Sequence, residues 1–323
     1  MKHVQQRPAG HLAPRRQQNW DWRAAGNFVC GGAGGGLLFL AALAHLAGAE
    51  VRHLIGAGLL LVGTGLFCVW LEIGRPWRAL NVFRHLRTSW MTREASVAPL
   101  LFISGALAVA GLHPALPVLA GLCGLAFLYS QARILAADKG IPAWRHPRCA
   151  AVVVATGLAE GAGLLALAAP VLPARLLPAA ALVLILALLA RLWLWKRYLA
   201  GLEADGAPLG SLQALSAIER RFVLFGHLVP AASAIAAAIG VPGATAACIL
   251  AGLMAVGGGW LFKYTLVRRA AFTQGIALKH LPVRGRGTPG PAVKPGWSGA
   301  SRYGAATIPV TSSAMSPRPP KRR

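Results

Sequence analysis

Long apolar segments recur along the chain, and each has the length of a membrane-spanning helix. Residues 27–47 contain no Asp, Glu, Lys or Arg. At about 1.5 Å per residue this segment reaches about 31 Å, close to the thickness of the hydrocarbon core of a bilayer. The segments are rich in Leu and Ala without polar alternation, which predicts helices rather than strands. The predicted spans are 27–47, 53–73, 95–112, 116–137, 149–170, 176–195, 219–240 and 243–265.

This pattern predicts an all-α fold, a polytopic membrane bundle of eight transmembrane helices. Small residues within the spans, such as GGAGGG at 31–36, allow helix backbones to approach closely in lipid. The chain divides into a basic N-terminal segment (1–26), a membrane domain (27–267) and a C-terminal tail (281–323). The tail is rich in Pro, Gly, Ser and Arg, and we expect it to be disordered because it cannot bury enough apolar surface to offset its ordering entropy.

Composition and charge fit this interpretation. Of 323 residues, 56% are hydrophobic and 13% charged, and 33 Lys and Arg outnumber 9 Asp and Glu. In a soluble protein this excess would suggest nucleic acid, but here it is concentrated between apolar segments, so no nucleic-acid partner is expected. The positive-inside rule places these basic connections and both termini in the cytoplasm. The basic segments, which hold 31 of the 33 cations, are 1–26, 75–93, 133–148, 191–221 and 263–323.

The connection after the second predicted span combines polar side chains with a helix-ending sequence. Residues 71–94 read LEIGRPWRALNVFRHLRTSWMTRE. Glu72 lies in the last turn of the span, and Gly74 and Pro76 end the helix after it, because proline lacks an N–H donor and restricts the residue before it. An ionisable group at the membrane edge is a functional candidate by default.

Arginines and tryptophans follow this acid. An acid, guanidinium donors and aromatic walls at the membrane edge would suit a lipid-soluble ring whose oxygens gain or lose protons. Two simpler interpretations stay open: Glu72 pairs with Arg75 or Arg78 and fixes the helix end, or the connection is a topological clamp at the headgroups. The candidates for ring binding are Glu72, Arg75, Trp77, Arg78, Trp90, Arg93 and Glu94.

A second acid, Glu160, lies near the middle of the fifth predicted span. We expect it to face the bundle interior, either in a proton path or as a protonated or paired carboxyl. His45 and His227 are single histidines in separate spans, and packing roles are favoured over ligation. The histidines do not pair across helices at matched depth and the five cysteines show no CxxC spacing, so neither haem nor metal is expected in this chain.

The motif around Glu72 resembles the membrane anchor subunits of DMSO-reductase-type molybdoenzymes, the DmsC/NrfD superfamily. It reads acid or His, apolar, Gly, x, Pro, x, Arg, and YSQAR at 129–133 is also similar to that family. NWDWRAAGNF at 19–28 is similar to the anchors of phenylacetyl-CoA:acceptor oxidoreductases, a subset of this family. The residues that carry the main motif are Glu72, Gly74, Pro76 and Arg78, followed by Ser89, Trp90, Arg93 and Glu94.

The resemblance implies a multi-pass protein of the bacterial inner membrane that is not an enzyme on its own. Such an anchor binds menaquinone or ubiquinone and exchanges electrons with an iron–sulfur subunit, which serves a molybdopterin catalytic subunit. DMSO-reductase anchors carry histidine where this chain has Glu72, which argues against DMSO reduction. A secondary transporter with a mid-membrane acid is the alternative, although no matched broken helices support it. Candidates for partner docking are Arg84, Arg87, Tyr129 and Arg133.

Overall fold

The computed structural model describes residues 13–73 and 76–274, and within them eight helices are long and apolar enough to cross a membrane. The predicted all-α, eight-span architecture is therefore confirmed. Arg75 and the tail 281–323, for which disorder is expected, lie outside the described residues, as do the side chains of Trp77 and Arg78.

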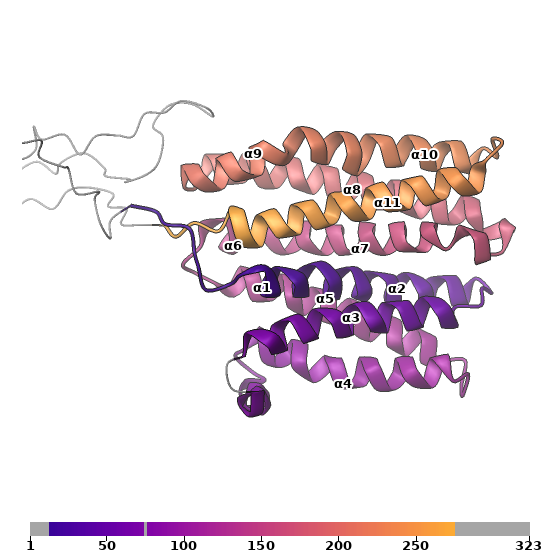
Figure 1. Cartoon of the computed structure of the whole chain (residues 1–323), viewed down its shortest axis with the longest axis horizontal. Helices are drawn as coiled ribbons and strands as arrows, with labels where there is room; N and C mark the ends of the chain where they lie inside the picture. The colour runs from indigo at the N-terminus through magenta and orange to yellow at the C-terminus, as the bar shows by residue number, and fades with distance from the viewer. Residues whose placement is uncertain (1–12, 74–75, 275–323) are drawn as a thin grey trace, which may run out of the picture.

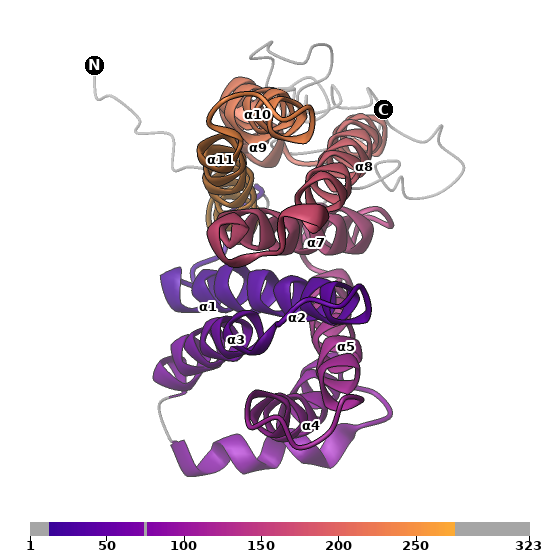
Figure 2. The same cartoon turned by 90° about the vertical axis from the view of Figure 1, so that its right-hand side faces the viewer.

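The N-terminal half of the described chain forms four spans. The first span is assembled from three consecutive helical pieces, whose middle turn is π-helical. A ten-residue 3₁₀ helix, η2, connects the second and third spans and lies across the outside of α4 (Figure 2). The elements are α1 (Trp22–Gly26), η1 (Asn27–Gly31), α2 (Gly32–Leu46), α3 (Arg52–Glu72), η2 (Pro76–His85), α4 (Trp90–Val109) and α5 (Leu116–Ala137).

The C-terminal half forms the other four spans. Its last two spans each contain a π-helical turn, η5 and η6. The elements are α6 (Pro142–Arg145), α7 (Cys149–Leu167), η3 (Ala169–Val171), η4 (Ala174–Leu176), α8 (Leu177–Ala204), α9 (Leu209–Val223), η5 (Leu224–Leu228), α10 (Val229–Ala238), α11 (Ala244–Tyr264) and η6 (Thr265–Arg269).

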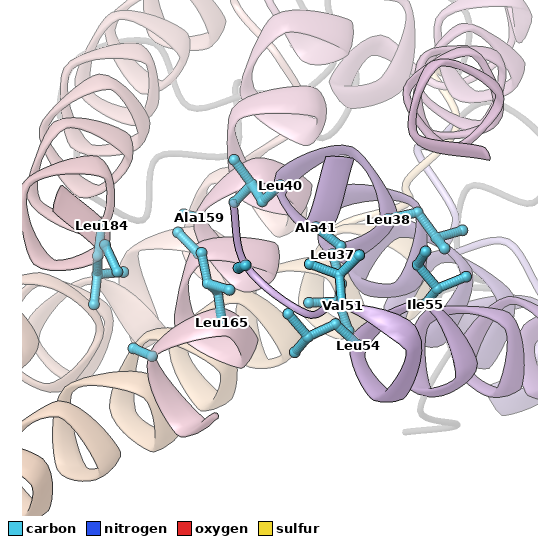
Figure 3. Packing of buried hydrophobic residues seen from close by; sticks show 14 of the residues in the cluster. Leu37, Leu38, Leu40, Ala41, Val51, Leu54, Ile55, Ala159, Leu165 and Leu184 are labelled. Carbon is cyan, nitrogen blue, oxygen red and sulfur yellow. The ribbon is translucent and has the colours of Figure 1, made fainter. Parts of the chain in front are cut away.

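The two halves pack side by side as two groups of roughly parallel helices (Figures 1 and 2). α2 packs on α3 and α5 within its own group and on α7 across the boundary. Leu37 and Ala41 of α2 share one buried cluster with Leu54 of α3, Ala159 of α7 and Leu184 of α8 (Figure 3). α2 and α7 thus form the central contact between the halves, where van der Waals packing rather than a hydrophobic drive holds helices together in lipid.

Glycines bring α2 and α7 into backbone contact. A Cβ atom on Gly36 would overlap the carbonyl oxygen of Gly157, and one on Gly161 would overlap the backbone of Gly36. Three glycines at one crossing therefore set the distance between the two halves, which is the packing that small residues permit in membranes.

We expect Gly161→Ala to destabilise the purified chain by about 1–3 kcal/mol, the usual effect of overpacking a tight contact. The matched control is Gly257→Ala in α11, because a Cβ atom there has no neighbour within 4 Å. Detergent-induced unfolding of both variants measures the difference. Equal stability of the two would contradict a close α2–α7 crossing.

The segment before α1 is hydrogen-bonded to the end of the last span, at the end of the bundle where α3 stops. The Gln17 backbone N–H donates to the Ala271 carbonyl at 2.8 Å, and the Gln17 amide donates to the Val267 carbonyl at 3.1 Å. Trp20 then stacks on Trp144 of α6, with ring centroids 4.9 Å apart. The start of the first span is thereby tied to the end of the last, and Trp20 is held over the interior of the bundle.

Candidate functional site

A cavity of about 430 Å³ lies between α1, α3 and α4, at the end where α3 stops and α4 begins. Its size falls within the range of about 300–1,000 Å³ that is typical of small-molecule sites. Aromatic walls come from Trp20, Phe28 and Trp70, and the carboxyl groups of Glu72 and Glu94 are both among its lining groups. An apolar cavity with two acidic side chains is suited to a lipid-soluble ligand that gains or loses protons.

Glu72 reaches this cavity because α3 ends directly after it. Ile73 adopts an extended conformation with ψ 104°, so the chain turns away and leaves the carboxyl half-buried at the rim. Arg23 lies close by: it donates to the Leu71 carbonyl at 2.8 Å but is paired with Asp21 at 2.9 Å. Hydrogen bonds from Arg23 lower the pKa of Asp21, which keeps this pair ionised. Arg75 lies outside the described residues, so the interpretation of Glu72 as a helix-end ion pair stays open.

Glu94 enters the cavity from the opposite wall. Ser89 caps α4 by accepting a hydrogen bond from the Thr92 N–H at 3.3 Å, which sets Glu94 one turn into the helix. Its side chain is buried, and the Asn27 amide donates to it at 3.3 Å. Asn27 belongs to the π-helical turn η1, and such turns are frequent at functional sites. Sequence reasoning did not single out Asn27, although it lies within NWDWRAAGNF.

Trp90 and Arg93 are not among the cavity-lining residues. The Arg93 and Arg133 guanidinium carbons lie 4.1 and 4.8 Å from the Trp90 ring centroid, and Tyr129 meets that ring edge-on. Arg93 also donates to the Leu86 and Arg87 carbonyls, so it braces the connection instead. Neighbouring helix residues point about 100° apart, which explains why Glu94 faces the cavity and Arg93 does not.

The docking candidates divide into two places. Arg84 and Arg87 are exposed on η2 and the turn that follows it. Tyr129 and Arg133 contact each other on α5, where the Arg133 guanidinium donates a hydrogen bond to the Tyr129 hydroxyl at 3.3 Å. Together with Arg93 they form a basic, aromatic surface beside the cavity.

Glu160 faces the interior, as expected, and its partner is Lys263. The two side chains lie 2.5 Å apart and are 0% and 1% exposed, respectively. The sequence interpretation missed this partner, because Lys263 was counted with the basic C-terminal segment. The signal available was a single lysine in the otherwise uncharged run GGGWLFKY at 257–264.

Arg191 is a second buried cation near this pair. It is fully buried, donates to His227 and the Ala255 carbonyl at 3.0 Å each, and also donates to the Gly226 carbonyl. His227 contacts Phe222 edge-on, and His45 lies 2.9 Å from the Pro114 carbonyl oxygen. Both histidines thus have local packing or hydrogen-bond partners.

No family model matches the chain, and no curated protein is significantly similar to it. The DmsC/NrfD resemblance therefore rests on the short motifs alone. Within residues 13–73 and 76–274, no three His, Cys, Asp or Glu side chains gather as metal ligands would. The main functional feature of the described residues is thus the cavity that Glu72 and Glu94 both line.

Proposed function

We propose that this chain is a quinone-binding membrane anchor that passes electrons between an iron–sulfur subunit and the quinone pool. The observation that carries the proposal is the pair of carboxyls, Glu72 and Glu94, in one aromatic-walled cavity at the end of the bundle. Quinone and quinol interconvert by two electrons and two protons. Two carboxyl groups in one chamber supply one proton carrier for each of those protons.

The lining residues fit a quinone ring. Trp20 and Trp70 offer flat apolar surfaces, which stack favourably with an aromatic ring. Glu72 and Glu94 would hold the ring oxygens by hydrogen bonds, and Asn27 orients the Glu94 carboxyl. Arg75, Trp77 and Arg78 remain candidates for the rim of the same site. Trp90 and Arg93 would support the site indirectly, by fixing the connection that precedes α4.

The chain would exchange electrons with a partner subunit, because the proposed role is electron transfer rather than substrate turnover. The exposed arginines Arg84 and Arg87 on the connection, and Tyr129 with Arg133 on α5, form two basic patches, which Arg93 and Trp90 link. Such a surface suits an acidic face on an iron–sulfur subunit, since complementary charge steers association. A molybdopterin catalytic subunit would complete the complex, and the resemblance suggests phenylacetyl-CoA as one substrate.

The eight spans make the chain a multi-pass membrane protein, and we propose the bacterial inner membrane with basic loops and both termini in the cytoplasm. With this orientation the catalytic partner would lie in the cytoplasm, where it could meet a CoA thioester, a substrate that cannot cross the membrane.

Reporter fusions test this orientation. We expect cytoplasmic signals after Arg93, Arg148 and Arg221 and outside signals after Glu50 and His113, because the connections alternate in basic charge. Cytoplasmic activity from the Glu50 fusion would contradict the orientation.

Copurification tests the proposed function. A tagged full-length chain, solubilised in mild detergent from its own cells, should bring down an iron–sulfur protein and a molybdenum protein in constant ratio. A photoreactive quinone should label segments 66–73 and 91–95, and excess natural quinone should abolish the labelling. Labelling confined to the apolar groove around Leu43 and Leu176, at the other end of the bundle, would refute the cavity as the site.

The transporter alternative has weaker support. A mid-membrane acid that binds a cationic substrate needs a free carboxylate, whereas Glu160 is already paired with Lys263 at 2.5 Å. Uptake of a solute by the purified chain alone, in vesicles that lack partner subunits, would favour the transporter.

A further inference from the structure

Among the described residues, three buried amide or carboxyl oxygens have no hydrogen-bond donor. They are Asn27 Oδ1, Gln131 Oε1 and Glu160 Oε1, and each is shielded from the surface. A buried acceptor without a donor is costly, and in native proteins such groups usually bind ordered water. These oxygens therefore mark positions where water is required.

The three oxygens belong to one connected set of polar groups. Asn27 donates to Glu94 in the cavity, and the Gln131 amide donates to the Asn27 carbonyl at 3.0 Å. Gln131 Oε1 and Lys263 Nζ both lie next to Gly32, in the space that a Cβ atom on this glycine would need. Lys263 in turn donates a hydrogen bond to Glu160. The set runs from the cavity to Glu160. This residue lies eleven positions after the first residue of α7, which is about 16 Å along the helix at about 1.5 Å per residue.

Glycines leave the room that these polar groups occupy. A Cβ atom on Gly31 would lie 2.6 Å from the Gln131 amide nitrogen, and one on Gly32 would overlap the Lys263 ammonium. A Cβ atom on Gly259 would lie 2.6 Å from the Glu160 Cγ. Gly31 ends the π-helical turn η1 that also carries Asn27. Glycines therefore make space for these polar side chains, in addition to allowing the close contact of α2 and α7.

We propose that Glu94, Asn27, Gln131 and the Lys263–Glu160 pair form a hydrated relay that moves protons between the cavity and the middle of the membrane. The relay rests on the proposed function, because quinone chemistry in the cavity supplies and consumes the protons. When Glu94 gives a proton to a quinone oxygen, a water held by Asn27 and Gln131 reprotonates it. That water regains its proton from the Lys263–Glu160 pair, and quinol oxidation reverses each transfer.

The charges around Glu160 allow the pair to give up a proton. Lys263 and Arg191 supply two buried cations against the one carboxylate, and both interact electrostatically with Glu160. Cys30 interacts electrostatically with Lys263, and His227 accepts a hydrogen bond from Arg191 at 3.0 Å. With all three charged groups ionised the cluster carries one excess positive charge, which is costly to bury, so loss of one proton brings it to neutrality.

The relay ends at Glu160. Beyond Glu160, Arg191 and His227, the buried side chains toward the far end of the described bundle are apolar except Ser104, which donates to the Leu100 carbonyl of its own helix at 2.6 Å. Leu37 and Leu40 of α2 and Leu165 of α7 fill this region (Figure 3). The pair therefore stores one proton: it gives this proton to Glu94 while quinone occupies the cavity, and after the quinol leaves it takes a proton back through the same waters from water that enters the cavity.

The first test is a cryo-EM map of the purified complex at a resolution that shows water. Ordered water on Asn27 Oδ1, Gln131 Oε1 and Glu160 Oε1 is the expected result. Apolar side chains packed directly against all three oxygens would overturn the relay. This measurement requires neither a variant nor quinone turnover.

The second test compares Gln131→Leu with Ser130→Ala, a neighbouring buried residue whose hydroxyl bonds only to its own helix. In the purified complex, Gln131→Leu should slow quinone-coupled turnover about tenfold or more and raise its solvent deuterium isotope effect, since proton transfer then limits the rate. Gln131→Glu, which keeps polar oxygens that can hold the water, should retain turnover, and Ser130→Ala should match the unmodified complex.

The outcomes separate the relay from the quinone site. If Glu72→Gln loses quinone turnover while Gln131→Leu keeps both its rate and its isotope effect, the relay is wrong and the quinone site stands. If both variants turn over quinone normally, these side chains do not carry protons for the quinone, and the relay fails together with the proposed role of Glu72.

Discussion

Replacing Glu72 by Gln should abolish most quinone-coupled turnover while the complex still assembles. Glutamine keeps the size and hydrogen bonding of the side chain but cannot carry a proton. General acid–base groups contribute about 10²–10⁴-fold, so we expect a loss of roughly 10²-fold or more in the quinone assay. Electron transfer to a soluble dye by the catalytic partner should stay unchanged, because that reaction bypasses the cavity. Steady-state rates with both acceptors measure the difference.

The control is Glu50→Gln, which removes a carboxyl from the exposed connection at the other end of the bundle. Glu50 precedes the start of α3, at the opposite end of that helix from Glu72, and its exposed carboxyl accepts a hydrogen bond from the Arg52 backbone N–H at 3.1 Å and pairs with the Arg52 side chain at 3.4 Å. Its removal should leave both assays unchanged. Normal quinone kinetics in a fully assembled Glu72→Gln complex would instead mean that the carboxylate only fixes the end of α3.

The hydrophobic pattern was sufficient to predict the spans, but it placed their ends less well. The predicted span 116–137 matches α5 (Leu116–Ala137), whereas the span predicted over 176–195 belongs to a helix that continues to Ala204. The seventh span was predicted from 219, and its helix starts at Leu209. Hydropathy reports the lipid-embedded part of a helix, and these helices continue past the hydrocarbon into the polar interface.

Charge was the less reliable guide to burial. Arg191 and Lys263 were counted with the basic connections, yet both are buried within the bundle. A positive charge marks the cytoplasmic edge only when no interior partner exists, and Glu160 and His227 are such partners. No local pattern joins residues that lie 103 and 36 positions apart, so these contacts could not be predicted from a single sequence.

The acids of the candidate site could be predicted from the sequence, but its aromatic walls could not, because the walls come from segments that are distant along the chain. Glu72 and Glu94 stood out because acids are rare at the membrane edge, and both line the cavity. The aromatic walls were predicted at Trp77 or Trp90, which follow Glu72 in sequence. Trp90 does not line the cavity, the Trp77 side chain lies outside the described residues, and the described walls are Trp20, Phe28 and Trp70. Trp20 is held at the cavity by the N-terminal segment, whose backbone forms hydrogen bonds with Ala271 and Thr273 after the last span.

Lys263→Met should destabilise the chain more than any surface substitution. It removes the ammonium that donates a hydrogen bond to the fully buried Glu160 carboxylate, and breaking a buried pair by removing one member costs about 3–5 kcal/mol. The matched control is Lys196→Met, which breaks a lysine–glutamate pair of similar length, 2.7 Å to Glu219, on a half-exposed surface. Such surface pairs contribute about 0–1 kcal/mol. Unfolding in mixed detergent micelles compares the two.

The double variant Lys263→Met, Glu160→Leu separates stability from proton transfer. Replacing a buried ion pair with apolar residues of similar volume is often neutral or stabilising, so we expect the double variant to regain most of the stability that Lys263→Met loses. If the pair only held α7 against α11, quinone turnover would return with the fold. If the pair stores a proton for the cavity, the stable double variant stays slow and keeps a raised deuterium isotope effect, because no neighbouring group replaces the lost carrier. Failure of the double variant to regain stability would instead show that the pair contributes more through specific geometry than its burial implies.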